Sequence, residues 1–307
     1  MANDGNVALY VRPEFENPAV EEAVVGDIER RLSLWERFSN MDPVRKFSVL
    51  ILLVVSWELY TRIGGINELM FPTFSATAKA LVSALVNEGL LQNVWNSIRL
   101  LFVGYCIGIL IAAVLVVLGV WSRFGGDLLT TLTAMLNPLP AIALLPLAMI
   151  WFGLGEEAII FTLLHSIIWP VALNTHAGFQ AVSETLRMVG RNYGLSGLSY
   201  IFKVLVPAAF PAILTGLRIG WAFAWRTLIA AELVFGGQVQ DTSGGLGAEG
   251  SNAGGLGWII FANQMENQTP YVFAGLFTVI IVGILIENGI FRNIEDRTIR
   301  KWGMQKA

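Results

Sequence analysis

The sequence predicts an all-α polytopic membrane protein with about six transmembrane helices. Of its 307 residues, 55% are apolar and only 14% are charged, a balance outside the usual range of soluble domains. The apolar residues gather in long segments, and the cations of the polar segments between them occur in alternate loops. Composition, segment length and loop charge therefore agree on the fold class.

Each long apolar segment has roughly the 20 residues that a bilayer requires, or somewhat more. The six predicted spans are residues 47–64, 93–121, 127–152, 156–178, 208–236 and 269–292. They make a transmembrane domain of residues 47–292, between an N-terminal tail, residues 1–46, and a C-terminal tail, residues 293–307. Because the N-terminus is polar and acidic, with no apolar signal-peptide core, we expect the first span to act as the insertion signal.

Loop charge predicts the orientation of these spans. Lys and Arg residues precede span one and follow spans two, four and six, whereas residues 237–268 contain acidic residues and no cation. By the positive-inside rule, both termini and the loop 179–207 lie in the cytoplasm. The loops after spans one, three and five then lie in the periplasm.

The N-terminal tail contains a candidate amphipathic helix over residues 21–38. Its apolar side consists of Val25, Ile28, Leu32, Trp35 and Phe38. Such a helix lies on the membrane or on a partner; the alternative is a weakly ordered tail.

Small residues and prolines predict local packing. Gly104-xxx-Gly108 lies in span two and Gly216-xxx-Gly220 in span five, where small residues allow two helices to approach closely. Span three contains three prolines, each of which removes a backbone donor: Pro138, Pro140 and Pro146. Span three is therefore predicted to be kinked or irregular and shielded by neighbouring helices.

The cytoplasmic loop contains a candidate docking element. Gly194 can adopt a positive φ and turn the chain sharply, and Ser196 can cap a second short helix. That helix is predicted to be amphipathic, with helical spacing of Leu198, Ile201, Phe202 and Leu205. Pro207 ends it or begins the next span. An ordinary polar loop is the simpler interpretation, but the turn followed by an amphipathic helix favours docking.

The same loop resembles the EAA loop of ABC importer permeases, in which a glycine is followed thirteen residues later by a proline, here Gly194 and Pro207. Met188, Val189 and Gly190 occupy the place of Glu-Ala-Ala. Three further segments resemble the nitrate, sulfonate, taurine and bicarbonate branch of this family: residues 71–81, 138–156 and 207–220. The resemblance extends from about Phe47 to about Arg292.

The resemblance implies the type I ABC importer permease fold in a bacterial inner membrane. It assigns ATPase coupling to loop residues Met188, Gly190, Arg191, Gly194, Ser196, Leu198 and Pro207. The implied partners are a pair of ATP-binding subunits that carry ATP and Mg, a second permease subunit, which we expect to be an identical copy, and a periplasmic or lipid-anchored substrate-binding protein, with membrane lipid around them. The implied substrate is a small anion such as nitrate, bicarbonate, taurine or another sulfonate.

A search for catalytic motifs supports a transport subunit rather than an enzyme. No glycine is followed by lysine, so the chain has no P-loop. No His/Cys/Asp/Glu cluster has the spacing of a metal site, and no basic, aromatic surface predicts nucleic-acid binding. The glycine-rich residues 244–257 have no Lys or Arg nearby and are read as a flexible turn, and Cys106 as a small buried residue.

Polar side chains within the spans are the remaining candidates, because ionisable groups are costly to bury in a membrane. They are His165 and Asn174 in span four and Arg218, Arg226 and Glu232 in span five. Arg226 is read either as a cation that lines the translocation path or as the partner of Glu232 or of a neighbouring helix. A structural or gating role is expected for Glu232, and a packing role for His165.

Two other classes of function would each require sequence features of their own. An autonomous secondary transporter or channel, the main alternative, would need coupling acids in the membrane and often contains inverted repeats. Glu58 and Glu232 are the acids well inside the spans, and no convincing repeat is present. A membrane-embedded enzyme would need a nucleophile–base pair or a metal constellation, and none is visible.

Overall fold

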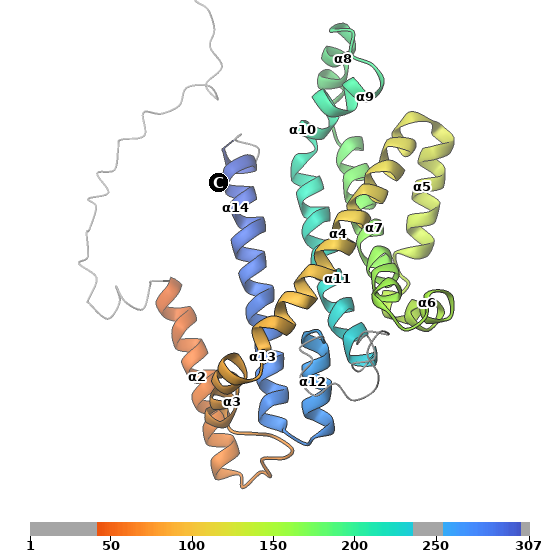
Figure 1. Ribbon diagram of the computed structural model, residues 1–307. Helices are drawn as coiled ribbons and strands as arrows, with labels where there is room; N and C mark the ends of the chain where they lie inside the picture. Colours follow the sequence, from red (N-terminus) through yellow and green to blue (C-terminus); the bar gives the residue numbers. More distant parts are fainter. Residues whose placement is uncertain (1–41, 236–253, 302–307) are drawn as a thin grey trace, which may run out of the picture. The chain divides into compact units, whose positions relative to one another are not determined.

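The computed structural model describes residues 42–235 and 254–301 (Figure 1). Within these ranges every regular element is helical, which confirms the all-α prediction. The predicted amphipathic helix over residues 21–38 lies outside the described residues. The chain divides into two units, residues 1–56 and residues 57–307, and the described part of the first unit is the beginning of helix α2, Asp42–Ile63.

Five of the predicted spans coincide with continuous helices. These are α2, α4 (Leu90–Trp121), α7 (Glu156–Gln180), α11 (Phe210–Phe235) and α13 (Thr269–Ile286). Helix α13 continues through three further helical segments, so the last helix runs past the predicted end at residue 292: η4 (Glu287–Phe291), α14 (Arg292–Glu295) and η5 (Asp296–Arg300).

By length and composition, three helices of the described chain can cross a membrane, or five if each of two bent pairs is one span. The three are α4, α7 and the helix from Thr269 to Ile299. Helix α2 lies on the first predicted span but is not among them. It has Lys46 near one end and Glu58 and Arg62 near the other, which leaves a short uncharged stretch between.

The predicted irregularity of span three is confirmed. Helix α5 (Arg123–Leu136) and the following pair η2 (Ala141–Leu144) and α6 (Leu145–Phe152) meet at a bend of 89°. Pro138 and Pro140 lie in the break between them. Because a proline has no N–H to donate to the preceding turn, the two prolines interrupt the helix there.

A second bend, which the sequence did not predict, precedes span five. A helical stretch consisting of α9 (Gly197–Tyr200), η3 (Ile201–Leu205) and α10 (Val206–Ala208) meets α11 (Phe210–Phe235) at 79°. Pro207 therefore lies in α10, before the bend, and α11 itself begins at Phe210.

Helix α7 packs between α4 and α11, and both glycine motifs face it. A Cβ at Gly108 of α4 would lie 2.8 Å from Ile167 Cγ2, and one at Gly216 of α11 would lie 2.8 Å from Asn174 Cβ. A Cβ at Gly220 would lie 3.5 Å from the Ile167 carbonyl oxygen. Ile167 thus lies between the two seams, and the predicted close approach of helices occurs at both.

Loops that were predicted to share a side of the membrane lie together. Thr269 Oγ1, at the start of α13, donates to the Leu69 carbonyl in the loop after α2, at 2.6 Å. At the other end, Trp121 of α4 lines a common cavity with Arg191 of α8 (Glu184–Asn192). Figure 1 shows α8 and α9 beyond one end of α11 and α12 (Leu256–Met265) beside the other. This arrangement agrees with the alternation of loop charge.

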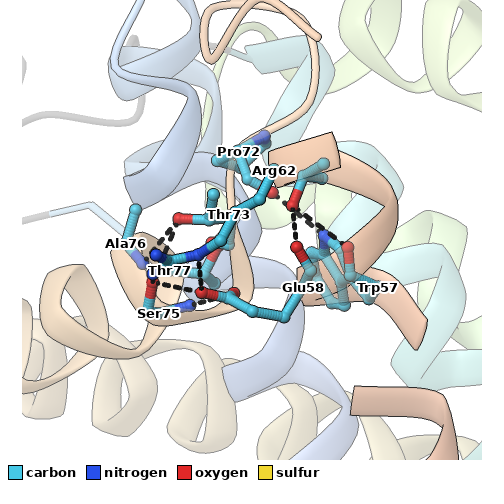
Figure 2. A network of polar contacts seen from close by, with 9 residues as sticks. Trp57, Glu58, Arg62, Pro72, Thr73, Ser75, Ala76 and Thr77 are labelled. Carbon is cyan, nitrogen blue, oxygen red and sulfur yellow. Dashed lines mark hydrogen bonds and ion pairs between the residues drawn. The ribbon is translucent and has the colours of Figure 1, made fainter. Parts of the chain in front are cut away.

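The Glu58 carboxylate binds the beginning of helix α3 (Phe74–Asn87), as Figure 2 shows. Glu58 Oε2 accepts from the Ser75 backbone N–H at 3.1 Å, and Oε1 accepts from the Ser75 hydroxyl at 2.9 Å and from Arg62 Nε at 2.7 Å. The Thr73 side chain caps the same helix by accepting from the Ala76 N–H at 3.1 Å. Glu58 therefore acts as a helix cap, an arrangement that the N-terminal end of a helix dipole favours.

Trp57 anchors the same region. Its Nε1 donates to the Pro72 carbonyl at 2.9 Å, and its ring lies 5.4–5.8 Å, centroid to centroid, from four phenylalanine rings: Phe71, Phe74, Phe273 and Phe277. This aromatic cluster joins the end of α2 to α3 and α13.

The Glu232 carboxylate caps the N-terminus of α12, just as Glu58 caps that of α3. Glu232, only 6% exposed, accepts from the Ser97 hydroxyl at 2.7 and 2.9 Å and from the Gly257 N–H at 2.7 Å. The Ser97 oxygen in turn accepts from the Leu256 N–H at 2.8 Å. One buried carboxylate thus connects α4, α11 and the N-terminus of α12.

The glycine seams predict a clear effect of a single methyl group. Gly108→Ala places a Cβ against Ile167, so we expect a loss of about 1–3 kcal/mol in stability from overpacking. Thermal unfolding of the detergent-solubilised protein would measure the loss as a lower Tm.

Gly289→Ala is the matched control, because nothing lies within 4 Å of its added Cβ. It should leave Tm unchanged or raise it slightly, since alanine favours helix over glycine. Equal Tm values for the two variants would contradict close packing at the α4–α7 seam.

Candidate functional site

The predicted docking element is a helical hairpin between α7 and α11. Its first helix, α8, begins at the N-cap Ser183 and ends in two backbone hydrogen bonds: Leu195 N–H to the Gly190 carbonyl at 3.1 Å and Gly194 N–H to the Arg191 carbonyl at 2.9 Å. This pair of bonds is the Schellman motif, which needs a left-handed residue directly after the helix. Gly194 is that residue, with φ of 71°, and the predicted positive φ is confirmed.

The second helix of the hairpin differs from the prediction in two respects. Ser196 occupies the N-cap position of α9, but its side chain makes no capping hydrogen bond. The predicted apolar face is also divided, because Ile201 and Leu205 are buried whereas Leu198 and Phe202 are exposed. The chain in this region forms one α-turn and then a π-helical turn, so helical spacing does not place the four side chains on one face.

Gly190 lies where the two parts of the hairpin cross. An added Cβ would lie 2.9 Å from Val204 Cγ2 and 3.1 Å from Tyr200 Cε2. The crossing therefore leaves no space for a Cβ at position 190, so packing favours glycine there.

Arg187 attaches the hairpin to the end of α7. Its Nε donates to the Val182 carbonyl at 3.0 Å, and its Nη2 donates to the Phe179 carbonyl at 2.5 Å. Carbonyls at a helix C-terminus lack partners within the helix, and the guanidinium supplies one. Arg187 thus ties the first helix of the hairpin to the end of α7.

The hairpin exposes a set of large apolar side chains, which we call its apolar face: Leu186, Met188, Val189, Tyr193, Leu198 and Phe202. Tyr193 is 82% exposed. Large exposed apolar side chains, on a loop that the charge pattern predicts to lie outside the membrane, are typical of a protein–protein contact surface.

A cavity of about 370 Å³ lies between the break in span three and helices α7 and α11. The break contributes residues 137–142, and the helices contribute several polar residues to the lining: His165, Ser166, Arg226 and Thr227. No Asp or Glu lines this cavity, and among the described residues no group of three or more His, Cys, Asp or Glu side chains could hold a metal ion.

Arg226 supplies the positive charge of this cavity. Its guanidinium carbon lies 5.9 Å from the centre of the Phe223 ring. Within residues 42–235 and 254–301 it makes no ion pair, and Glu232 is engaged with Ser97 and the start of α12. Of the two interpretations of Arg226, the geometry favours a cation that faces a cavity.

Three further side chains from α7 and α11 contribute to the polar lining. Both ring nitrogens of His165 are buried and have no hydrogen-bond partner in the described part of the chain. Ser166 Oγ and Thr227 Oγ1 lie 2.8 Å apart and join α7 to α11. The cavity therefore offers a positive charge, two hydroxyl groups and an imidazole ring.

The other predicted path residues lie elsewhere. Arg218 Nη2 donates to Glu295 Oε2 at 2.9 Å, and its Nε lies 2.9 Å from Glu287 Oε1 in an ion pair without hydrogen-bond geometry. Asn174 donates to the Pro170 carbonyl of its own helix at 2.8 Å. Of the five candidates, Arg226 and His165 line the cavity, whereas Arg218, Asn174 and Glu232 do not.

Comparison with known proteins identifies the family. Residues 104–300 match the family model described as the binding-protein-dependent transport system inner membrane component. The chain belongs to this family. The permease is 31% identical to the nitrate import permease protein of Synechocystis over 66% of its own length and 68% of the relative. It is 29% identical to the taurine transport system permease protein of Escherichia coli over 78% of its own length and 83% of the relative.

Sequence reasoning missed several residues that shape these sites. Ser166 and Thr227 were not singled out, although each directly follows a predicted candidate, His165 or Arg226, because the search was confined mainly to ionisable groups. Gly197 has a φ of 57°, and only its place after another turn glycine, Gly194, could have indicated this. Arg187 was counted as loop charge alone, and its role depends on where α7 ends.

The hairpin crossing can be tested by proteolysis of the permease. Gly190→Ala should push α8 away from Tyr200 and Val204, so the hairpin should open more often and trypsin should cleave faster after Arg187 and Arg191. Leu198→Ala is the control, since its exposed side chain is not part of the crossing. Equal cleavage rates in the two variants would argue against a tight crossing at Gly190.

Proposed function

We propose that this permease forms the translocation path for a small anion and couples that path to a separate ATP-binding subunit. The observation that carries the proposal is the cavity around Arg226, which has a cation and no acidic residue in its lining. A guanidinium that faces a cavity of low polarity attracts an anion much more strongly than one in bulk water.

The polar groups around Arg226 suit a small oxyanion. The Ser166 and Thr227 hydroxyls and the His165 ring can donate hydrogen bonds, and Arg226 can donate two in parallel to a pair of oxygens. The cavity volume of about 370 Å³ accommodates nitrate, bicarbonate, taurine or another small sulfonate. The names of the relatives, a nitrate and a taurine permease, support this class of substrate.

Coupling to ATP hydrolysis follows from the position of the hairpin. It connects α7 directly to α11, the two helices that contribute His165, Ser166, Arg226 and Thr227 to the cavity. A partner that pulls on the hairpin therefore moves both walls. Since the chain has no P-loop, ATP and Mg would bind to that partner, and this chain would be a transport subunit rather than an enzyme.

The assembly that we propose contains two permease subunits, most simply identical, and two ATP-binding subunits on their hairpins. A two-fold axis through the path would place two such cavities in one channel. A substrate-binding protein, periplasmic or lipid-anchored, would dock at the end formed by α3 and α12. The chain would lie in the inner membrane among its lipids, with both termini cytoplasmic.

An autonomous secondary transporter is less well supported. It would need a carboxylate free to exchange a proton or ion during transport. Glu58 and Glu232 are both committed to helix N-termini.

Gly194 tests the coupling role. Gly194→Val forces a β-branched residue into a left-handed conformation, at a cost on the order of 1–3 kcal/mol, so the hairpin should distort. ATP hydrolysis by the reconstituted complex should then no longer depend on substrate delivery, and uptake into proteoliposomes should fall.

Gly194→Asn is the matched control, because asparagine tolerates positive φ and nothing crowds its Cβ. It should retain coupled transport. Full coupling in Gly194→Val would contradict the role given to the hairpin.

Arg226 tests the anion path. Arg226→Ala should lower uptake of a transported anion by at least about tenfold through loss of a charged hydrogen-bonding group, while the complex still assembles. Arg218→Ala should instead lower the stability and assembly of the complex, because it breaks the ion pairs to Glu287 and Glu295. Normal uptake by the Arg226→Ala protein would remove this residue from the path.

A further inference from the structure

A second cavity, of about 520 Å³, lies between the hairpin and the end of α4. Trp121 of α4 forms one side, and Arg187, Arg191, Ser196 and Tyr200 are among the hairpin residues that form the other. No acidic residue lines it. It is thus a cationic recess built from the hairpin itself, separate from the cavity around Arg226.

The polar groups of this recess are largely unsatisfied. Arg191, in the last turn of α8, is exposed and has no ion pair in the described part of the chain. The Tyr200 hydroxyl is buried without a hydrogen-bond partner, and the Ser196 hydroxyl is not used as a helix cap. Arg187, in contrast, is fixed by two backbone carbonyls, so its charge stays in the wall of the recess.

Contact with a partner would remove water from the Arg191 guanidinium. A protein that covers the apolar face of the hairpin also removes water from the recess beside it. Removing water from a guanidinium that gains no anion is strongly unfavourable, whereas a carboxylate in a bidentate pair compensates for much of the lost hydration. A partner that binds here therefore needs an acidic side chain opposite Arg191.

The hairpin cannot supply that acid itself. Met188 stands where the family pattern has glutamate, and Glu184, at the first turn of α8, is not part of the recess. Since no acid of the described residues pairs with Arg191, charge complementarity assigns the acid to the partner and the cation to the permease.

We propose that this recess receives an aspartate or glutamate side chain of the ATP-binding subunit, with Arg191 as the cation and Tyr200 and Ser196 as hydroxyl donors. The proposal rests on the proposed function, because it needs that subunit to dock on the hairpin. A protein carboxylate, rather than a lipid phosphate, fits because the same hairpin presents an apolar face that a protein would cover.

The first test measures the affinity of the ATP-binding subunit that co-purifies with the permease, isolated separately, for the permease in nanodiscs. Arg191→Glu should weaken binding by about tenfold or more, and Arg191→Lys by much less. Lys203→Glu is the matched control, since it makes the same charge change on an exposed residue of the hairpin that does not line the recess. Tyr200→Phe should weaken binding by a few-fold through loss of one donor.

The second test uses the Arg191→Lys protein in the whole complex. A carbodiimide joins a lysine amine to a carboxylate that touches it, and mass spectrometry would identify the linked acid. A cross-link from position 191 to an aspartate or glutamate of the ATP-binding subunit, absent from the wild-type complex, supports the proposal.

Two results would overturn the assignment while leaving the proposed function intact. One is equal affinity of the Arg191→Glu and Lys203→Glu proteins for the ATP-binding subunit. The other is loss of bound anionic phospholipid from the Arg191→Glu protein with unchanged subunit affinity, which would make the occupant a lipid phosphate. If the wild-type permease binds no P-loop subunit at all, the proposed function fails, and the assignment fails with it.

Discussion

The close packing of α7 between α4 and α11 is the constraint on which the rest of the structure depends. Ile167 fits between Gly108 on one side and Gly220 on the other, so the three helices have little freedom to slide. His165 and Ser166 of α7 then face Arg226 and Thr227 of α11 across one cavity. Because the hairpin joins α7 to α11, it is connected in the chain to both helices that line this cavity.

Four charged residues within the spans have two kinds of surroundings. Glu58 and Glu232 satisfy the N-termini of α3 and α12, and Arg218 pairs with Glu287 and Glu295. Arg226 faces a cavity and has no acidic partner among the described residues. This division leaves Arg226 facing a cavity, whereas the other three residues take part in structural ion pairs and helix caps.

The hairpin shows which structural features the local sequence predicts and which it does not. The turn at Gly194 was predictable because a positive φ is a property of one residue and its immediate neighbours. The packing role of Gly190 could not be predicted in this way, because it depends on contact with Tyr200 and Val204. The predicted cap at Ser196 and the single apolar face from Leu198 to Leu205 were wrong, because Ser196 makes no capping bond and a π-turn replaces regular helical spacing.

The sequence by itself determined the all-α membrane class, the order of the apolar segments, the break at Pro138 and Pro140 and the alternation of charged loops. These features follow from composition and from residues close together in the chain. Only the tertiary structure decided which polar groups meet, as when Ser97 binds Glu232 from 135 positions away. Such pairs depend on how each helix is rotated about its axis. In an apolar span that rotation is set by contacts between helices, here the glycine seams on α7, rather than by an amphipathic pattern that the sequence could reveal.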